Sequence, residues 1–162
     1  MPIPAMIPGA PPATETTMPS TTPRNFVRAT PAAQPEDALE HFTARLELET
    51  DCWDVHASMK LDDPGFVLVD VWAPEYFDAG HIPGAINIPH PQLTEERLAE
   101  FPSDLLFVVY CAGPHCNGAS KGAVRLATLG RPVKEMIGGA IGWLDEGYEL
   151  VATPSTPNGS RV

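Results

Sequence analysis

The sequence predicts an α/β fold in which a central parallel sheet carries helices on both faces. Two apolar runs, 66–71 and 107–110, are rich in β-branched and aromatic residues, as expected for strands buried on both faces. Segments with helical patterns and turn residues at their ends separate the apolar runs, and this alternation is typical of a parallel sheet. The length of 162 residues suits one such domain with tails.

The ends of the chain differ in composition from its middle. Residues 1–35 are rich in Pro, Thr and Ala and nearly free of large apolar side chains, so we expect a disordered, Pro-rich N-terminal tail. The Pro, Ser, Thr and Gly content over 152–162 predicts a second tail. The domain is therefore expected to span 36–151.

Each element of the domain is predicted from its local pattern. Acidic residues in a first turn favour a helix that begins near Glu36. Alternation of Leu46 and Leu48 predicts a short strand over 45–49. The elements expected after it are helix 52–61, strand 66–71, helix 75–79, strand 86–88, helix 91–101 with Thr94 as its cap, strand 107–110, helix 119–129, strand 133–137 and a last helix between Gly139 and Gly147.

Cys111 lies between the buried strand 107–110 and the helix 119–129. Open α/β sheets bind their ligands at strand ends of this kind. The backbone amides of a tight loop and of a helix N-terminus carry partial positive charge, which lowers the pKa of a thiol below its usual value of about 8.5. We therefore predict that Cys111 is a nucleophilic thiolate that can hold a transferable group. The alternative is a buried structural cysteine.

Two other side chains stand out. Asp70 lies near the end of the apolar run 66–71, where a carboxylate is costly unless it is hydrogen-bonded or paired. We expect it to hold an active-site loop in place, and a surface-facing aspartate is the alternative. His81 lies in a Gly-His-Ile-Pro-Gly turn, where we favour a histidine that bonds backbone groups over a general base. Cys52 is expected to pack in or near the core.

Charge and cysteine content limit the partners. A net charge of -11 argues against nucleic acid, because binding to phosphates needs clusters of Lys and Arg. An odd number of cysteines, two of them close together at Cys111 and Cys116, fits a reducing compartment and a reactive thiol. No secretory signal and no apolar run of membrane-spanning length is found, so we expect a cytoplasmic protein that does not bind a membrane.

Four local patterns together give the region from about 36 to 150 a resemblance to a known family. They are Val69-Asp70-Val71 followed by Pro74-Glu75-Tyr76, then Gly80-His81-Ile82-Pro83-Gly84-Ala85-Ile86-Asn87-Ile88-Pro89, then Val109-Tyr110-Cys111 before an Ala-rich helix, and finally Gly138-Gly139 with Trp143 and Gly147. In this order and spacing they resemble a rhodanese-like (sulfurtransferase) domain of the short single-domain type.

The resemblance implies a sulfurtransferase that needs no metal and no organic cofactor. Cys111 matches the cysteine that takes sulfane sulfur from thiosulfate or a persulfide, becomes a persulfide, and passes the sulfur to a thiol, cyanide or a protein acceptor. Asp70, Trp72 and His81 are expected to support the site. We expect a monomer or a small homo-oligomer. The loop residues that would surround the persulfide are Ala112, Gly113, Pro114, His115, Cys116, Asn117, Gly118, Ala119 and Ser120.

The chain departs from the family pattern in its cations and in a second cysteine. Trp72 stands where the family often has arginine, and the loop after Cys111 carries no arginine. Fewer cations weaken the attraction of dianionic thiosulfate, which favours a persulfide or a protein donor. Cys116 is an alternative nucleophile, a resolving thiol that forms a disulfide with Cys111, or a side chain that fills the loop.

Two other functions compete with sulfur transfer. A non-catalytic binding or regulatory module of the same fold is the main alternative, although the retained Cys111 weighs against it. A cysteine phosphatase needs an arginine six positions after its nucleophile to clamp phosphate. That position is Asn117, so phosphatase chemistry is not favoured.

Overall fold

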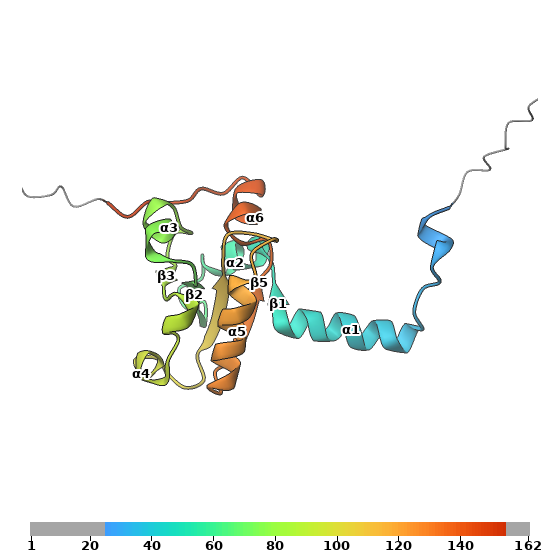
Figure 1. The fold of residues 1–162 in the computed structure, drawn as a ribbon, viewed down its shortest axis with the longest axis horizontal. Coiled ribbons are helices and arrows are strands. Elements are labelled where there is room, and N and C mark those ends of the chain that lie inside the picture. Colours follow the sequence, from blue (N-terminus) through green and yellow to red (C-terminus); the bar gives the residue numbers. More distant parts are fainter. Residues whose placement is uncertain (1–24, 155–162) are drawn as a thin grey trace, which may run out of the picture. The chain divides into compact units, whose positions relative to one another are not determined.

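The computed structural model describes residues 25–154 (Figure 1). The chain divides into two compact units, Met1–Gln34 and Pro35–Val162. The described part of the first unit contains a short 3-10 helix, η1, over Val27–Ala29. The two tails expected from the sequence lie largely outside the described residues. None of the helices within the described range combines the length and the apolar character needed to cross a bilayer.

The second unit is built on five parallel strands in the order β1-β5-β4-β2-β3. The strands are β1 (Glu49–Thr50), β2 (Phe66–Asp70), β3 (Ile86–Asn87), β4 (Leu106–Tyr110) and β5 (Val133–Met136). The helices are α1 (Pro35–Leu48), α2 (Cys52–Ser58), α3 (Pro74–Ala79), the 3-10 helix η2 (His90–Gln92), α4 (Glu95–Leu98), α5 (Gly118–Thr128) and α6 (Gly139–Asp145). The predicted α/β fold with a parallel sheet is confirmed.

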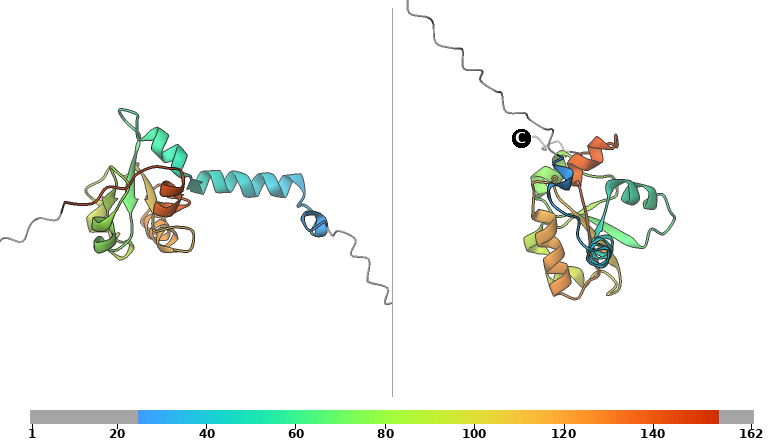
Figure 2. Two further views of the ribbon diagram at one scale, coloured as in Figure 1. Left: turned by 90° about the horizontal axis from the view of Figure 1, so that it is seen from above. Right: turned by 90° about the vertical axis from the view of Figure 1, so that its right-hand side faces the viewer.

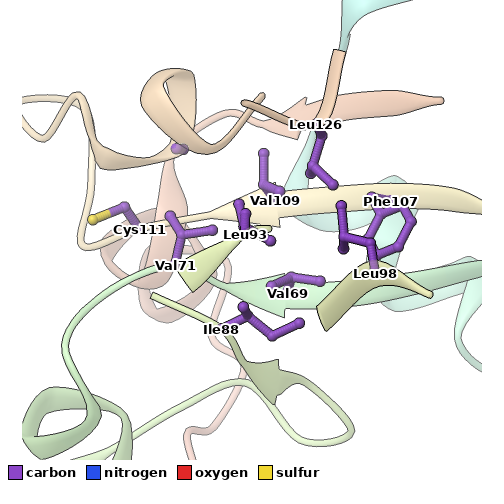
Figure 3. Close-up of a cluster of buried hydrophobic side chains, with 10 residues drawn as sticks. Val69, Val71, Ile88, Leu93, Leu98, Phe107, Val109, Cys111 and Leu126 are labelled. Carbon is purple, nitrogen blue, oxygen red and sulfur yellow. The ribbon is translucent and has the colours of Figure 1, made fainter. Parts of the chain in front are cut away.

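Successive side chains of β4 point to opposite faces of the sheet and enter two separate cores. Phe107 and Val109 pack with Leu126 of α5 in one core, which Cys111 extends just beyond the strand (Figure 3). Val108 and Tyr110 pack in the other core with residues of α2 and α6. Figure 2 (right) shows α5 and α2 on opposite sides of the strands. The period of two along β4 therefore places Cys111 on the same face as α5.

The strand predicted over 45–49 is wrong, because α1 continues to Leu48 and β1 starts only at Glu49. Leu46 and Leu48 are 73% and 63% exposed, so no buried face favours an alternating strand there. Arg45 instead forms an ion pair with Glu49 at 2.9 Å, with the i,i+4 spacing that suits a helix.

The helix predicted over 91–101 is shorter than expected. Thr94 caps α4 as predicted, by accepting a hydrogen bond from the Arg97 amide at 3.3 Å. The helix nevertheless ends at Leu98. Pro102 contributes to this early end, because the residue before a proline avoids helical backbone angles.

Candidate functional site

Cys111 lies one residue beyond β4, at the carboxyl edge of the sheet, and its side chain is 4% exposed. It lines a cavity of about 690 Å³. The segment 135–139, at the end of β5 and the start of α6, forms another wall of this cavity. The predicted loop residues that also line the cavity are Gly113, Pro114, His115, Cys116, Asn117, Ala119 and Ser120. Ala112 and Gly118 do not belong to this lining, but their backbone amides form hydrogen bonds with the cysteine sulfurs.

The sulfur atoms of Cys111 and Cys116 lie 2.6 Å apart, in direct contact, and either thiol could donate its proton to the other. The loop that joins them turns back on itself, because the Cys116 amide donates to the Gly113 carbonyl at 2.9 Å. Gly118, the first residue of α5, closes the site from the other side. A Cβ at Gly118 would lie 2.8 Å from the Cys111 sulfur and 3.4 Å from the Cys116 sulfur. The absence of a side chain there lets the helix N-terminus approach both thiols.

The two thiols differ in acidity. Burial, reinforced by the hydrogen bond to Cys116, raises the pKa of Cys111 to about 12. Burial also acts to raise the pKa of Cys116, but the hydrogen bond from Cys111 and those from the Gly118 and Ala112 amides lower it below its usual value. The pair therefore ionises first at Cys116. The lowered pKa that we predicted for Cys111 is wrong, because burial of the thiol and its contact with Cys116 outweigh the hydrogen bond from the Ala112 amide.

The start of α6 holds the backbone next to Cys111. The Ala140 amide donates to the Cys111 carbonyl at 3.0 Å, and the Ile141 amide donates to the Ala112 carbonyl at 2.9 Å. Gly139 has a φ of +59°, and a Cβ on it would lie 2.3 Å from the Cys111 carbonyl oxygen. The sequence showed the Gly138-Gly139 pair only as a family pattern. Its contact with the cysteine loop joins segments that are far apart in the chain.

Asp70 is buried, with an exposed fraction of 3%, so the surface-facing alternative is wrong. Its Oδ1 accepts a hydrogen bond from the Trp72 amide at 2.9 Å. The Tyr110 hydroxyl donates to the same carboxylate and accepts from the Ile82 amide at 3.1 Å. Asp70 therefore links the end of β2 to the last residue of β4, directly before Cys111.

Burial raises the pKa of Asp70, and the hydrogen bonds from Trp72 and Tyr110 only partly offset this effect. The folded state thus holds the proton more tightly than the unfolded state, so the contribution of Asp70 to stability falls as pH rises above about 4. We expect Asp70→Asn to lack this dependence. The unfolding free energy of the variant, minus that of the wild type, should increase from pH 4 to pH 7 in urea titrations, and a difference that is flat or falls with pH would contradict this assignment.

The other two supporting residues make local contacts. His81 Nδ1 lies 2.8 Å from the Phe77 carbonyl oxygen, and the His81 ring stacks on the Phe77 ring. The His81 backbone pairs with Val151, which ties the turn to the end of the domain. Trp72 stacks on Tyr76 with ring centroids 4.0 Å apart. These contacts are structural, and both residues shape the surroundings of the site from outside the cavity lining.

Glu135 is a site residue that the sequence did not reveal. It lies in β5, lines the cavity, and accepts a hydrogen bond from Ser120 Oγ at 2.9 Å. The described residues that line the cavity include this carboxylate and no lysine or arginine. Glu135 therefore opposes the approach of an anionic ligand, while the charge of Lys121, outside this lining, acts on Cys116 in the opposite sense. Within the same part of the chain, no group of three His, Cys, Asp or Glu side chains could hold a metal ion.

A buried cysteine at the end of a central parallel strand, inside a loop that leads to a helix, is the arrangement predicted for the rhodanese-like fold. A family model described as "Rhodanese-like domain" matches residues 55–146, and the chain belongs to this family. The BH2092 protein from Bacillus halodurans superimposes with a TM-score of 0.71 at 38% identity, over 74% of this chain and 88% of that one.

Two further similar proteins have names that refer to function. The HTH-type transcriptional regulator Rv0324 of Mycobacterium tuberculosis (strain ATCC 25618 / H37Rv) is 49% identical over 77 residues, or 47% of this chain and 33% of the regulator. The chain thus matches about a third of that relative's length. A thiosulfate sulfurtransferase from Pseudomonas aeruginosa shares the fold, with a TM-score of 0.55 and 20% identity over 74% of this chain and 23% of that one.

Proposed function

We propose that this protein is a sulfurtransferase that carries sulfane sulfur as a persulfide on Cys111. The observation that supports this most directly is the hydrogen-bonded pair of Cys111 and Cys116 on the wall of an open cavity. A nucleophile needs an adjacent base, and the sulfur of Cys116, whose pKa is the lower of the two, lies 2.6 Å from the Cys111 sulfur. The pair must be reduced to work, which favours a reducing compartment such as the cytoplasm.

The transfer would occur in two steps. Cys116 removes the proton from Cys111 as the Cys111 sulfur attacks the outer sulfur of the donor, and the rest of the donor leaves as sulfite or as a thiolate. A nucleophilic acceptor then attacks the outer sulfur of the persulfide and restores Cys111. Backbone amides that already point at the sulfurs, such as those of Ala112 and Gly118, stabilise the negative charge in both steps.

The negative charge of Glu135 in the cavity lining disfavours a small anionic sulfur donor. Thiosulfate is a small dianion, and Glu135 repels it without a lysine or arginine in the described lining to compensate. We therefore favour a low-molecular-weight persulfide or a protein persulfide as the donor, and a thiol as the acceptor.

A non-catalytic regulatory module is the second candidate function. The name of the regulator Rv0324, which is similar to this chain over 77 residues, favours it. A module of this kind would recognise a partner through the same fold without carrying sulfur. The two candidates differ in one measurable property, which is the uptake of sulfur by Cys111.

Intact mass spectrometry tests this proposal directly. Three variants of the chain, Cys116→Ser, Cys111→Ser and the control Cys52→Ser, would be reduced. Each would then be exposed briefly to thiosulfate and, separately, to glutathione persulfide. We expect Cys116→Ser to gain one sulfur and Cys111→Ser to gain none. A gain in Cys111→Ser alone would move the carrier to Cys116. No gain in folded Cys116→Ser, together with neither a gain nor a release of sulfide in Cys52→Ser, from either donor, would favour the regulatory module.

A further inference from the structure

The position of Cys116 allows more than proton transfer. Its sulfur lies 2.6 Å from the Cys111 sulfur, whereas the sulfurs of a disulfide are about 2.05 Å apart. A closure of roughly 0.5 Å would therefore join them. In a Cys111 persulfide, the atom next to Cys116 is the inner sulfur, which is Cys111 Sγ itself. The outer sulfur is bonded to that atom and is the group that an attack from Cys116 would displace.

We propose that Cys116 resolves the Cys111 persulfide by forming an internal disulfide, so that the sulfane sulfur leaves as hydrosulfide. This inference rests on the proposed persulfide on Cys111. The Cys116 sulfur forms a bond to Cys111 Sγ, and the bond from Cys111 Sγ to the outer sulfur breaks. The outer sulfur is reduced and leaves as HS⁻ with the proton of Cys116, while the two cysteines are oxidised to the disulfide. No external electron acceptor is needed.

Three features of the site favour this reaction. The Gly118 and Ala112 amides that lower the pKa of Cys116 do not depend on the Cys111 thiol, so they still favour a Cys116 thiolate as its proton moves to the outer sulfur. The cavity beside both sulfurs is open, which gives the hydrosulfide a way out. Glu135 in the cavity lining disfavours the retention of an anion.

The loop between the two cysteines favours the reaction as well. The Cys116 amide is bound to the Gly113 carbonyl at 2.9 Å, and the loop therefore holds the two sulfurs together before the reaction. Such pre-positioning removes most of the entropic cost of bringing two groups together. The disulfide that results needs an external dithiol to regenerate the reduced pair, so repeated release of hydrosulfide would consume a dithiol reductant.

The wild type, Cys116→Ser and Cys52→Ser would be reduced, loaded with glutathione persulfide without oxygen, and freed of small thiols by rapid desalting. Sulfide release and intact mass under non-reducing conditions would then be followed over time. Wild type and Cys52→Ser should release one equivalent of sulfide and lose two hydrogens relative to the reduced chain. Cys116→Ser should load more slowly, keep its added sulfur, and release sulfide at least ~10-fold more slowly.

The outcomes separate this inference from the proposed function. If Cys116→Ser takes up no sulfur and the wild type neither gains sulfur nor releases sulfide, the persulfide on Cys111 is wrong. If Cys116→Ser takes up sulfur and the wild type retains its added sulfur just as long, without a disulfide, the resolving role of Cys116 is wrong. Transfer of the sulfur to Cys116, seen as an added sulfur on its peptide, would also overturn it. Unloaded wild type, kept in parallel, should form no disulfide.

Discussion

Gly139→Ala is expected to lower both the stability of the domain and the reactivity of Cys111. The added Cβ would lie 2.3 Å from the Cys111 carbonyl oxygen and 2.8 Å from the Gly113 amide nitrogen, and both are backbone atoms. Neither atom belongs to a flexible side chain, so the loop or the start of α6 must move. We expect a loss of about 3 kcal/mol of unfolding free energy, from the positive φ and the overlap together.

This movement should also affect the chemistry. The hydrogen bonds from Ala140 and Ile141 to the carbonyls of Cys111 and Ala112 hold the loop at its first two residues. If α6 shifts, the Cys111 sulfur loses its position relative to the Cys116 sulfur, and uptake of sulfur from a persulfide donor should slow by at least ~10-fold. Thermal unfolding and the rate of sulfur uptake by intact mass would measure the two effects.

Gly130→Ala is the matched control for Gly139→Ala. Gly130 has a φ of +70°, close to that of Gly139, but nothing lies within 4 Å of its Cβ position. The control therefore carries the backbone cost of about 1 kcal/mol without the overlap, and its sulfur uptake should match that of the wild type. Equal losses of stability in the two variants would show that the contact between Gly139 and the cysteine loop has no energetic importance.

The sequence predicts the parts of the site that depend on local pattern. An apolar run, a cysteine, a loop broken by Gly113 and Pro114, and an Ala-rich helix follow one another in the chain. Their order is enough to place Cys111 at a strand end beside a helix N-terminus. The strand expected at 45–49 is absent, because burial decides whether an alternating pattern becomes a strand. Two alternating leucines are a weak pattern, and only burial, which Leu46 and Leu48 lack, would have enforced it.

The properties of the site that sequence does not predict depend on contacts between distant segments. The pKa of Cys111 is set by its burial and by its contact with the Cys116 sulfur, and neither is encoded in local spacing. Glu135 reaches the cavity because β5 lies beside β4 in the sheet. The strand order depends on the whole chain. The sequence of the cysteine loop alone therefore does not predict that a carboxylate from β5 lines the cavity.

Glu135→Gln is expected to raise the rate at which thiosulfate loads Cys111 by ~10-fold at low ionic strength. The substitution removes the carboxylate from the cavity lining and keeps an oxygen that can accept the hydrogen bond from Ser120. Because thiosulfate carries two negative charges, the gain should shrink as salt is added. Loading would be followed by intact mass in the Cys116→Ser background, where the added sulfur is expected to remain on Cys111.

A pair of alkylating reagents separates electrostatic repulsion from a change in cysteine reactivity. The cysteine sulfur displaces iodide from both iodoacetate and iodoacetamide, which have nearly the same size, but only iodoacetate is charged. If Glu135 acts by repelling anions, Glu135→Gln should accelerate alkylation by iodoacetate several-fold more than alkylation by iodoacetamide. Equal acceleration of both would instead mean that Glu135 acts on the thiol pKa. In that case the preference for a persulfide over thiosulfate would lose its physical basis in this cavity.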